Sequence, residues 1–319
     1  MCLTENKSKV TILVPCYNEE ENLPLLYNAL CNTKGCLCEN FQYSFQILLV
    51  NDGSTDKTQE VIEMLSEKDD RIDYVSLSRN FGKECAMLAG FDYAKGDCMV
   101  IIDADLQDPP ELIPEMIKYW EEGYEDVYAR RSNRGKESLI RKTLSLTFYR
   151  VLQKSSKIDM LPNVGDFRLL DRKCIEAMKE LREKERYTKG LFAWIGFKKK
   201  EIVFERHDRK KGQSAWNYGS LFHLAIDGIT SFTTAPLRIA TVLGILVSLA
   251  AFAYMCFVFI KALLWGDPVT GYPSMMVVIL FLGGIQLLCL GIIGEYLAKI
   301  FNEAKNRPVY VVGKSKIRE

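Results

Sequence analysis

Two carboxylates spaced one residue apart follow a short apolar run in the segment Met99-Val-Ile-Ile-Asp103-Ala-Asp105. Because residues i and i+2 of an extended chain share a face, both carboxylates could point at one divalent cation. Their hard oxygens suit Mg²⁺ or Mn²⁺, ions that usually keep several waters and bind substrate phosphates. The pair therefore predicts a metal site for a phosphorylated substrate, although an isolated Asp-x-Asp is more often only the polar turn that ends a strand.

Two earlier segments have the same form, in which an apolar run ends in polar residues. Residues 9–15 lead into Cys16-Tyr17-Asn-Glu19, and residues 45–50 lead into Asn51-Asp52-Gly-Ser. The runs are short, rich in β-branched residues and do not alternate, which is typical of strands covered on both faces. Helical patterns follow at residues 20–30, 55–66 and 83–94, the second with Thr55 or Asp56 as its N-cap.

This β-α-β-α-β order predicts a parallel, doubly wound sheet. Ligands bind such sheets beyond the carboxyl ends of the strands. We therefore expect the polar side chains that follow the strands to gather at one edge of the sheet. These side chains are Tyr17, Asp52, Asp103 and Asp105.

The motifs at these strand ends resemble those of family 2 glycosyltransferases with the GT-A fold. The matching segments are Val14-Pro15-Cys-Tyr17-Asn-Glu19-Glu, Val50-Asn-Asp52-Gly-Ser-Thr-Asp56, Arg79-Asn-Phe-Gly82-Lys83 and Asp103-Ala-Asp105-Leu-Gln107-Asp-Pro-Pro. Within that family the chain is similar to the polyprenyl-phosphate glycosyltransferases, meaning bactoprenol glucosyltransferases and dolichol-phosphate mannose synthase. The resemblance covers nearly the whole length. It implies an α/β fold in which a GT-A (Rossmann-like) domain with a mostly parallel sheet precedes a C-terminal hairpin of two transmembrane helices.

Length and composition agree with one catalytic domain and an appendage. The chain has 319 residues and a net charge of +1, which gives no indication of nucleic-acid binding. The first residues lack the apolar core of a signal peptide, so the first domain should fold in the cytoplasm. Ten scattered cysteines without a secretion signal favour reduced thiols. Cys31, Cys36 and Cys38 form a cluster, but no His or Cys-x-x-Cys pairing accompanies them to favour zinc.

Two long apolar runs near the C-terminus predict transmembrane helices. Residues 239–260 and 268–294 contain no charged side chain, and each run exceeds the roughly 20 residues that span a bilayer. We place the helices at about 238–261 and 273–297, with Trp265 and Tyr272 near the far interface. Basic residues flank the other end of the hairpin: Arg238 precedes the first helix, and Lys299, Lys305, Arg307, Lys314 and Lys316 follow the second. Flanking segments rich in Lys and Arg mark the cytoplasmic side. The chain is thus expected to be a multi-pass protein of the cell (inner) membrane with both termini inside.

The predicted domain organisation follows from these runs. Residues 1–218 form the cytoplasmic glycosyltransferase domain, 219–236 an interfacial juxtamembrane helix, 237–298 the two transmembrane helices, and 299–319 a cytoplasmic tail. Residues 139–152 carry apolar side chains at helical spacing with basic residues between them. That pattern fits a helix in the membrane interface, and equally an ordinary amphipathic helix packed on the sheet.

A lipid-phosphate acceptor would need cationic positioning more than a strong base. A phosphate monoester has a second pKa of about 6 and is therefore largely an oxyanion at neutral pH. Basic residues follow the expected strand 126–129, although those at 134 and 136 could instead face anionic lipid. They are Arg130, Arg131, Arg134, Lys136 and Arg141. The resemblance implies that Arg131, Arg141 and Ser145 contact the acceptor phosphate.

The resemblance also implies the roles of residues on the donor side. Asp103, Asp105 and Gln107 would surround a Mg²⁺ or Mn²⁺ ion that bridges the diphosphate, although Asp103 could contact the nucleotide instead. The nucleotide-sugar pocket would comprise Pro15, Tyr17, Glu19, Asp52, Lys83, Asp103, Arg209 and Lys211, with Asp52 reading the base. Asp166 could orient a sugar hydroxyl or act as a weak base, and it forms the catalytic set with Asp105 and Arg131. The basic loop at residues 209–216 would close over the diphosphate, or is a surface charge cluster.

One departure from related synthases bears on the reaction. Processive family 2 enzymes carry Gln-x-x-Arg-Trp and several membrane helices, whereas this chain has Gln213-Ser-Ala-Trp216 and two helices. We therefore expect a single sugar to be transferred once, with the inversion implied by the family, from UDP-glucose to undecaprenyl phosphate. The alternatives are GDP-mannose, UDP-N-acetylglucosamine or an aminoarabinose donor, or a non-catalytic membrane-anchored nucleotide-sugar-binding protein. The intact set of Asp103, Asp105, Gln107 and Arg131 argues against the last.

Association between copies of the chain is a further expectation. Gly283, Gly284, Gly291 and Gly294 permit close helix approach, and Gln286 would favour a polar partner in mid-membrane. Packing within the hairpin would explain the same pattern, so a homotetramer rests on the resemblance. The strand-like residues 308–312 could add an edge strand between subunits, although nothing in the sequence favours that arrangement over others.

Overall fold

The computed structural model describes residues 8–33, 42–132, 164–184, 186–204, 235–265 and 271–318. Several predictions from the sequence lie outside these ranges. They concern the interfacial stretches at 139–152 and 219–234, the loop at 209–216, and the residues Cys36, Cys38, Arg134, Lys136, Arg141, Ser145, Arg209 and Lys211.

One eight-stranded sheet forms the centre of the α/β domain, in the order β7-β5-β6-β4-β1-β2-β3-β8. The strands are β1 (Lys9–Cys16), β2 (Ser44–Asn51), β3 (Ile72–Leu77), β4 (Cys98–Ile101), β5 (Asp126–Arg131), β6 (Val164–Asp171), β7 (Lys199–Phe204) and β8 (Val312–Lys316). Strands β4, β1, β2 and β3 are parallel, as are β5 and β7, whereas β6 and β8 are antiparallel to their neighbours. The mostly parallel sheet is confirmed, and the two antiparallel strands are additions to it.

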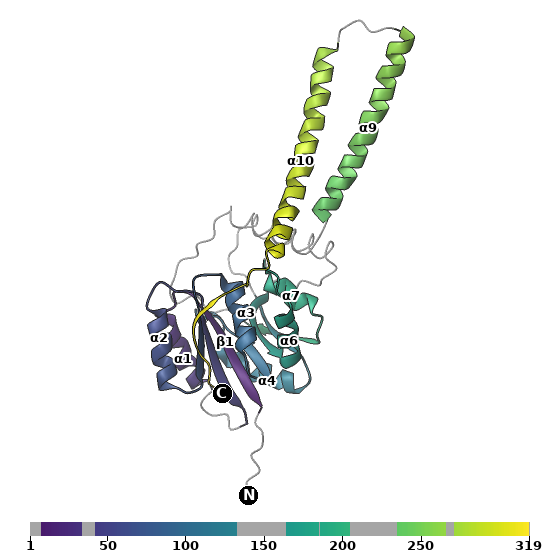
Figure 1. The fold of residues 1–319 in the computed structure, drawn as a ribbon. Coiled ribbons are helices and arrows are strands. Elements are labelled where there is room, and N and C mark those ends of the chain that lie inside the picture. The colour runs from purple at the N-terminus through teal and green to yellow at the C-terminus, as the bar shows by residue number, and fades with distance from the viewer. Residues whose placement is uncertain are drawn as a thin grey trace.

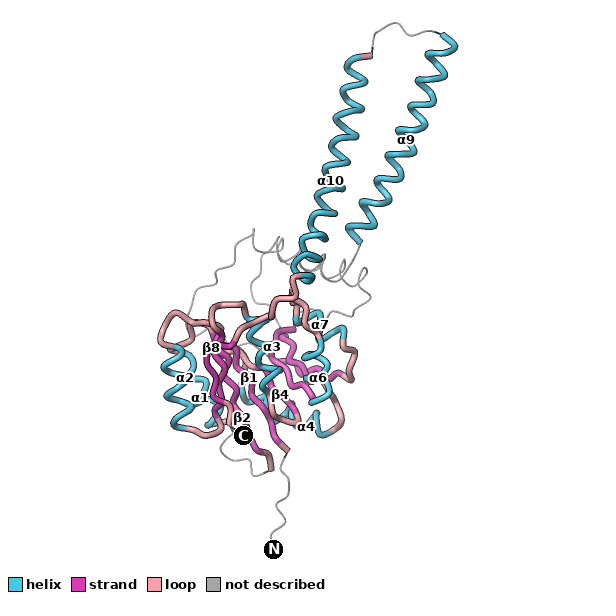
Figure 2. The backbone as a smooth tube through the Cα atoms, viewed as in Figure 1, coloured by secondary structure: helices cyan, strands magenta, loops and turns pink. Residues whose placement is uncertain are grey.

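Helices cover both faces of this sheet, as Figure 2 shows. The helices of the α/β domain are α1 (Asn22–Asn32), α2 (Thr58–Lys68), α3 (Lys83–Tyr93), the 3-10 helix η1 (Pro110–Leu112), α4 (Ile113–Glu121), α6 (Arg172–Glu180) and α7 (Thr188–Trp194). Two further helices, α9 (Ala235–Trp265) and α10 (Tyr272–Ala304), lie outside the sheet. Leu26, Ile62 and Met116 bring α1, α2 and α4 into one core cluster. Helices α3, α6 and α7 contribute to a second cluster, which includes Leu13 of β1. The unalternating strand sequences thus result from burial on both faces.

The predicted limits of the first three helices, 20–30, 55–66 and 83–94, differ from the observed ones by up to three residues. Helix α2 begins at Thr58 with Lys57 in the N-cap position, not at Thr55 or Asp56. The Asp56 carboxylate still accepts a hydrogen bond of 3.0 Å from the Thr58 amide, whereas the Thr55 hydroxyl and amide donate to Asn18. Thr55 is thus engaged by Asn18 of the turn after β1, a long-range contact that the local sequence does not show.

Helices α9 and α10 form an antiparallel hairpin that projects from one end of the α/β domain (Figure 1). Each contains a stretch long and apolar enough to cross a membrane, at Pro236–Tyr254 and Phe281–Ala304, and these stretches are 6% and 0% buried. Such exposed apolar surface indicates membrane association. Both helices extend beyond the apolar runs, to Trp265 and Ala304, because a helix continues through polar residues once its backbone bonds are in place.

The C-terminal tail returns from the hairpin to the sheet of the same chain. Strand β8 begins at Val312, the last residue of the predicted 308–312 segment, and pairs antiparallel with β3. The Arg318 amide donates to Asp73 at 2.9 Å and its guanidinium donates to the Ile72 carbonyl at 2.6 Å. The tail therefore extends the sheet of its own chain, next to β3.

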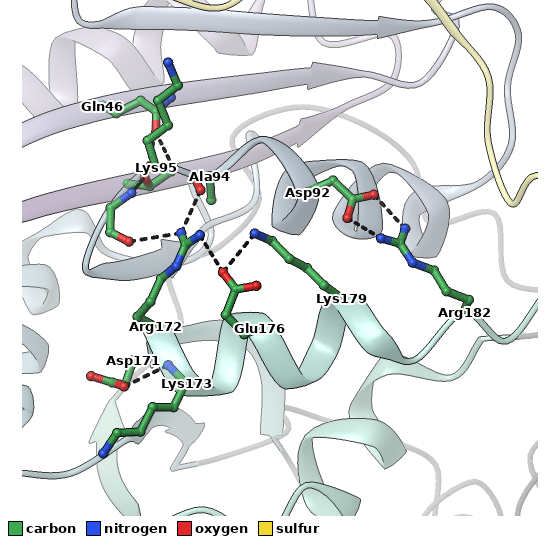
Figure 3. Close-up of polar contacts among 12 residues, drawn as sticks. Gln46, Asp92, Ala94, Lys95, Asp171, Arg172, Lys173, Glu176, Lys179 and Arg182 are labelled. Atoms are coloured by element: carbon green, nitrogen blue, oxygen red, sulfur yellow. Dashed lines mark hydrogen bonds and ion pairs between the residues drawn. The ribbon is translucent and has the colours of Figure 1, made fainter. Parts of the chain in front are cut away.

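The segment between α6 and α7 holds the base of the hairpin and is itself tied to α3. The Lys184 ammonium donates to the carbonyls of Asn302 at 2.5 Å and Glu303 at 3.0 Å, at the C-terminal end of α10. The Arg182 guanidinium meets both oxygens of Asp92 at 2.7 and 2.6 Å, as Figure 3 shows. The segment between α6 and α7 thus fixes α10 relative to the sheet.

Candidate active site

A cavity of about 320 Å³ lies where β1, β2 and β4 end, at the carboxyl edge predicted from the sequence. Strand β1 starts at the end of the domain that is far from the hairpin and runs toward it (Figure 1). Most of the predicted donor-site residues within the described ranges line this cavity. They are Pro15, Tyr17, Glu19, Asp52, Lys83, Asp103 and Asp105.

The two carboxylates of the Asp-x-Asp motif reach the cavity by a turn and not by strand spacing. Strand β4 ends at Ile101, so the argument that Asp103 and Asp105 share the face of a strand was wrong. Leu106 has a φ of 58°, and the Asp105 carboxylate accepts a hydrogen bond of 3.1 Å from the Gln107 amide. This tight turn directs both carboxylates into the cavity. The Gln107 side chain is buried and is not part of the cavity wall.

Lys83 connects two acidic residues at this edge of the sheet. Its ammonium lies 2.6 Å from Asp103 Oδ1 and 2.7 Å from Asp166 Oδ2, and Lys189 lies 4.0 Å from Asp166 Oδ1. Burial raises the pKa of Asp166, but the attraction of Lys83 and Lys189 outweighs it and lowers the pKa to about 2. Desolvation lowers the pKa of Lys83, yet Asp103 and Asp166 together raise it above its ordinary value. Lys83 and Asp166 are therefore both charged at neutral pH.

Asp52 anchors a loop that forms another wall of the cavity. Its oxygens accept hydrogen bonds from the amides of Phe81 at 2.7 Å and Gly82 at 2.8 Å. Burial raises the pKa of Asp52, and these two amides partly offset the effect. Gly53 has a φ of 64°, and a side chain there would meet the Arg79 backbone at 2.2 Å. Asp52 thus positions the Arg79–Gly82 loop while lining the cavity, whatever contact it makes with a base.

The turns after β1 and β2 hold each other in place. Asn18, with a φ of 55°, accepts a hydrogen bond of 2.9 Å from the Thr55 amide, and its own amide donates to Ser54 at 3.0 Å. The Glu19 amide donates to the Thr58 hydroxyl at 2.8 Å. Tyr17 remains 45% exposed at the cavity mouth. An aromatic ring in this position is free to stack on a flat ligand.

The predicted acceptor-side residues are only partly within the described chain. Arg131 ends β5 and lies 3.9 Å from the buried Asp108, outside the cavity wall, and its side chain is 26% exposed. Arg130 points elsewhere, to Glu201 of β7 at 2.8 Å. The structure thus separates two adjacent arginines that the sequence could not distinguish.

Sequence reasoning missed several residues at the site. Cys16, Asn80, Gly82 and Ala86 also line the cavity, and all but Ala86 lie in motifs that were recognised. Lys189 reaches Asp166 from α7, a helix that was not predicted. No local pattern marks Lys189, because only the packing of α7 against the sheet brings it there.

Comparisons with known proteins identify the family of this chain. The family model described as Glycosyl transferase family 2 matches residues 11–178, which span β1 through most of α6. This chain belongs to glycosyltransferase family 2. A second family model, described as GtrB C-terminal hairpin, matches residues 235–300 and therefore the hairpin of α9 and α10.

Relatives of this glycosyltransferase align over nearly its whole length. A Synechocystis protein named "Uncharacterized glycosyltransferase sll0501" is 46% identical and covers 95% of this chain and 94% of its own. The "Putative glycosyltransferase CsbB" of Bacillus subtilis is 42% identical, with coverages of 97% and 92%. The "Bactoprenol glucosyl transferase" of Shigella phage SfII is 41% identical, with coverages of 96% and 98%.

Proposed function

We propose that this glycosyltransferase transfers one sugar from a nucleotide-sugar, with UDP-glucose as the first candidate, to a polyprenyl phosphate at the membrane surface. The observation that carries the proposal is the position of the acidic cavity relative to the hairpin. Lys184 contacts the end of α10, and Lys189, five residues further along, contacts Asp166 of the site. A cavity beside a membrane anchor suits a water-soluble donor and a lipid-linked acceptor. The 41% identity to a bactoprenol glucosyl transferase supports the same pairing.

Asp103 and Asp105 are the residues that would hold a divalent ion. Among the described residues, no group of three or more His, Cys, Asp or Glu side chains could ligate a metal alone. Two carboxylates on one cavity wall nevertheless fit Mg²⁺ or Mn²⁺, since these ions take their remaining oxygens from water and substrate phosphates. When bound, the ion would neutralise charge on the departing nucleoside diphosphate.

Charged residues near the cavity would position the acceptor phosphate and orient the sugar. The acceptor phosphate is already a nucleophilic oxyanion, so the enzyme mainly has to position it. Arg131 would bind this phosphate together with Arg141 and Ser145, which lie outside the described residues. Asp166, held ionised by Lys83 and Lys189, would orient a hydroxyl of the sugar. The same proposal includes inversion at the anomeric carbon of the sugar. It also places the domain and both termini in the cytoplasm and takes the protein to be a homotetramer.

The donor is identified by offering the purified full-length protein radiolabelled UDP-glucose, UDP-N-acetylglucosamine, GDP-mannose and an aminoarabinose donor, each with undecaprenyl phosphate. We expect the label to enter the lipid fraction from UDP-glucose. Incorporation from another donor would retain the reaction and change the sugar. No incorporation from any of them would contradict the proposal.

Replacing Arg131 with alanine should weaken the use of the acceptor selectively. Hydrogen bonds to charged groups contribute roughly 1.5–3 kcal/mol each, so kcat/KM for the lipid phosphate should fall by about 10²-fold. Donor affinity, measured by equilibrium binding of the nucleotide, should not change. Arg130→Ala is the matched control, because Arg130 pairs with Glu201, and its effect should stay below about threefold. Equal losses in both variants would remove Arg131 from the acceptor site.

The pH dependence should report on the acceptor and not on Asp166. Because the pKa of Asp166 is lowered to about 2, this carboxylate stays charged across the pH range of the assay around neutrality. The acceptor monoester protonates below about pH 6, so kcat/KM should fall on the acid side of that value. We expect Asp166→Asn to lower the plateau of the profile without moving the acid limb. An acid limb that disappears in Asp166→Asn would assign the titration to the carboxylate.

A further inference from the structure

Lys83 joins the predicted metal site to Asp166, a carboxylate of another strand. Its ammonium lies 2.6 Å from Asp103, which follows β4, and 2.7 Å from Asp166 on β6. Asp103 is one of the two carboxylates that would hold the divalent ion. In this structure its Oδ1 atom already has a cationic partner.

The backbone that carries Lys83 is fixed on both sides. Gly82, in the N-cap position of α3 with a φ of 99°, donates its amide to Asp52 at 2.8 Å. On the other side, the Glu84 carboxylate accepts a hydrogen bond of 2.9 Å from the Thr188 amide. Any exchange of partners by Lys83 must therefore be a rotation of its side chain. The side chain is 41% exposed and has room to rotate.

A divalent ion and the Lys83 ammonium compete for Asp103. Like charges on one carboxylate repel each other, and the repulsion is strong in a partly desolvated cavity. A nucleoside diphosphate changes this balance because it brings negative charge that both cations can share. Asp166 also has a second cation, Lys189 at 4.0 Å, so its charge does not depend on Lys83 alone.

We propose that Lys83 is a positioning residue that makes metal binding conditional on the donor. Without a nucleotide, the ammonium holds Asp103 and disfavours the ion. When the diphosphate enters, Lys83 releases Asp103, keeps its contact with Asp166 and faces the diphosphate, and the ion binds Asp103 and Asp105. The inference rests on the proposed function, since it takes these two carboxylates as the metal ligands. Its consequence is that the enzyme takes up the ion and the donor together.

The test is a titration of the full-length protein with Mn²⁺, in which free Mn²⁺ is followed by electron paramagnetic resonance with and without saturating UDP. In the wild type, UDP should tighten Mn²⁺ binding by at least about tenfold, and Mn²⁺ should tighten UDP binding by the same factor. In Lys83→Gln, Mn²⁺ should bind at least about tenfold more tightly than in the wild type when UDP is absent. The additional effect of UDP should shrink accordingly.

Two variants serve as controls. Lys189→Gln removes a cation that contacts Asp166 but not Asp103, so the coupling between UDP and Mn²⁺ should remain as in the wild type. Lys83→Arg keeps the positive charge and should keep Mn²⁺ binding weak without UDP, even if Lys83→Gln folds poorly. Thermal unfolding of each variant checks that the fold is intact.

The possible outcomes distinguish a failure of the Lys83 inference from a failure of the proposed metal site. Equal Mn²⁺ affinity of wild type and Lys83→Gln without UDP, with tight binding in the presence of UDP, would overturn the role of Lys83 and leave the metal site standing. Loss of the coupling between UDP and Mn²⁺ in Lys189→Gln would also overturn the role of Lys83. A wild type that binds no Mn²⁺ even with UDP would overturn both the inference and the proposed metal site.

Discussion

Replacing Asp105 with alanine is expected to lower the rate of sugar transfer by about 10³-fold. A metal ion contributes several kcal/mol to the stabilisation of transition-state charge, and each 1.36 kcal/mol corresponds to about one power of ten in rate. Asp105 lines the cavity beside Asp103, and the turn that positions it includes its own hydrogen bond to the Gln107 amide. Initial rates at saturating donor and acceptor measure the effect.

Controls distinguish this loss from a general disturbance. Asp70→Ala removes a carboxylate that is 94% exposed and remote from the cavity wall, so its rate should stay within about twofold of the wild type. The unfolding temperature of Asp105→Ala should remain near that of the wild type, because Asp105 is not buried. A rate reduced by less than tenfold would show that Asp105 does not hold an essential ion.

Replacing Arg168 with methionine should destabilise the protein by about 3–5 kcal/mol, the usual cost of leaving one partner of a buried ion pair alone. Arg168 lies 3.1 Å from Asp126, and the two side chains are 5% and 0% exposed. The guanidinium also lies 3.8 Å from the centre of the Phe192 ring. It therefore joins β5, β6 and α7, the elements that carry Arg131, Asp166 and Lys189. Chemical denaturation in detergent measures the loss.

The destabilisation should depend on pH in a defined direction. Burial raises the pKa of Asp126, and Arg168 partly offsets the shift, so removing Arg168 raises the pKa further. A carboxyl group whose pKa is raised in the folded state costs stability as pH rises above its unfolded-state pKa, and the cost is complete above the folded-state pKa. The defect of Arg168→Met should accordingly be largest at neutral pH and shrink as pH falls and Asp126 becomes neutral.

A double variant tests the assignment of this effect to the lone carboxylate. Asp126→Asn combined with Arg168→Met removes both charges and should recover much of the lost stability. If Arg168→Met costs less than about 1 kcal/mol, or if the double variant is as unstable as the single one, the buried pair is not the cause.

The apolar pattern of the sequence was sufficient for β1, β2 and β4, because these central strands are buried on both faces. It failed for β3, whose sequence Ile72-Asp-Tyr-Val-Ser-Leu77 is interrupted by polar residues. Asp73 is nonetheless buried, and it accepts hydrogen bonds from Gln46 at 2.7 Å and from the Arg318 amide. From sequence alone, a polar residue such as Asp73 is expected to be solvent-exposed, because its hydrogen-bond partners are not known. One of these partners, Arg318, lies at the far end of the chain.

The site was predicted where its residues lie in one motif, and missed where it depends on packing. Asp103 and Asp105 were correctly expected at the cavity, although a turn and not a strand places them there. The ion pair between Lys83 and Asp166 joins residues that are 83 positions apart. It forms because β6 is antiparallel to β4, with Ile101 opposite Arg168. No periodicity in the sequence encodes that register.

The most direct test of the account is the formation of a lipid-linked sugar by the purified full-length enzyme from labelled UDP-glucose and undecaprenyl phosphate. We predict a labelled lipid that appears with Mn²⁺ or Mg²⁺, is absent with EDTA, and is nearly absent with Asp105→Ala. Release of free glucose alone, or a lipid product that forms equally well in EDTA, would contradict the proposed site and its chemistry.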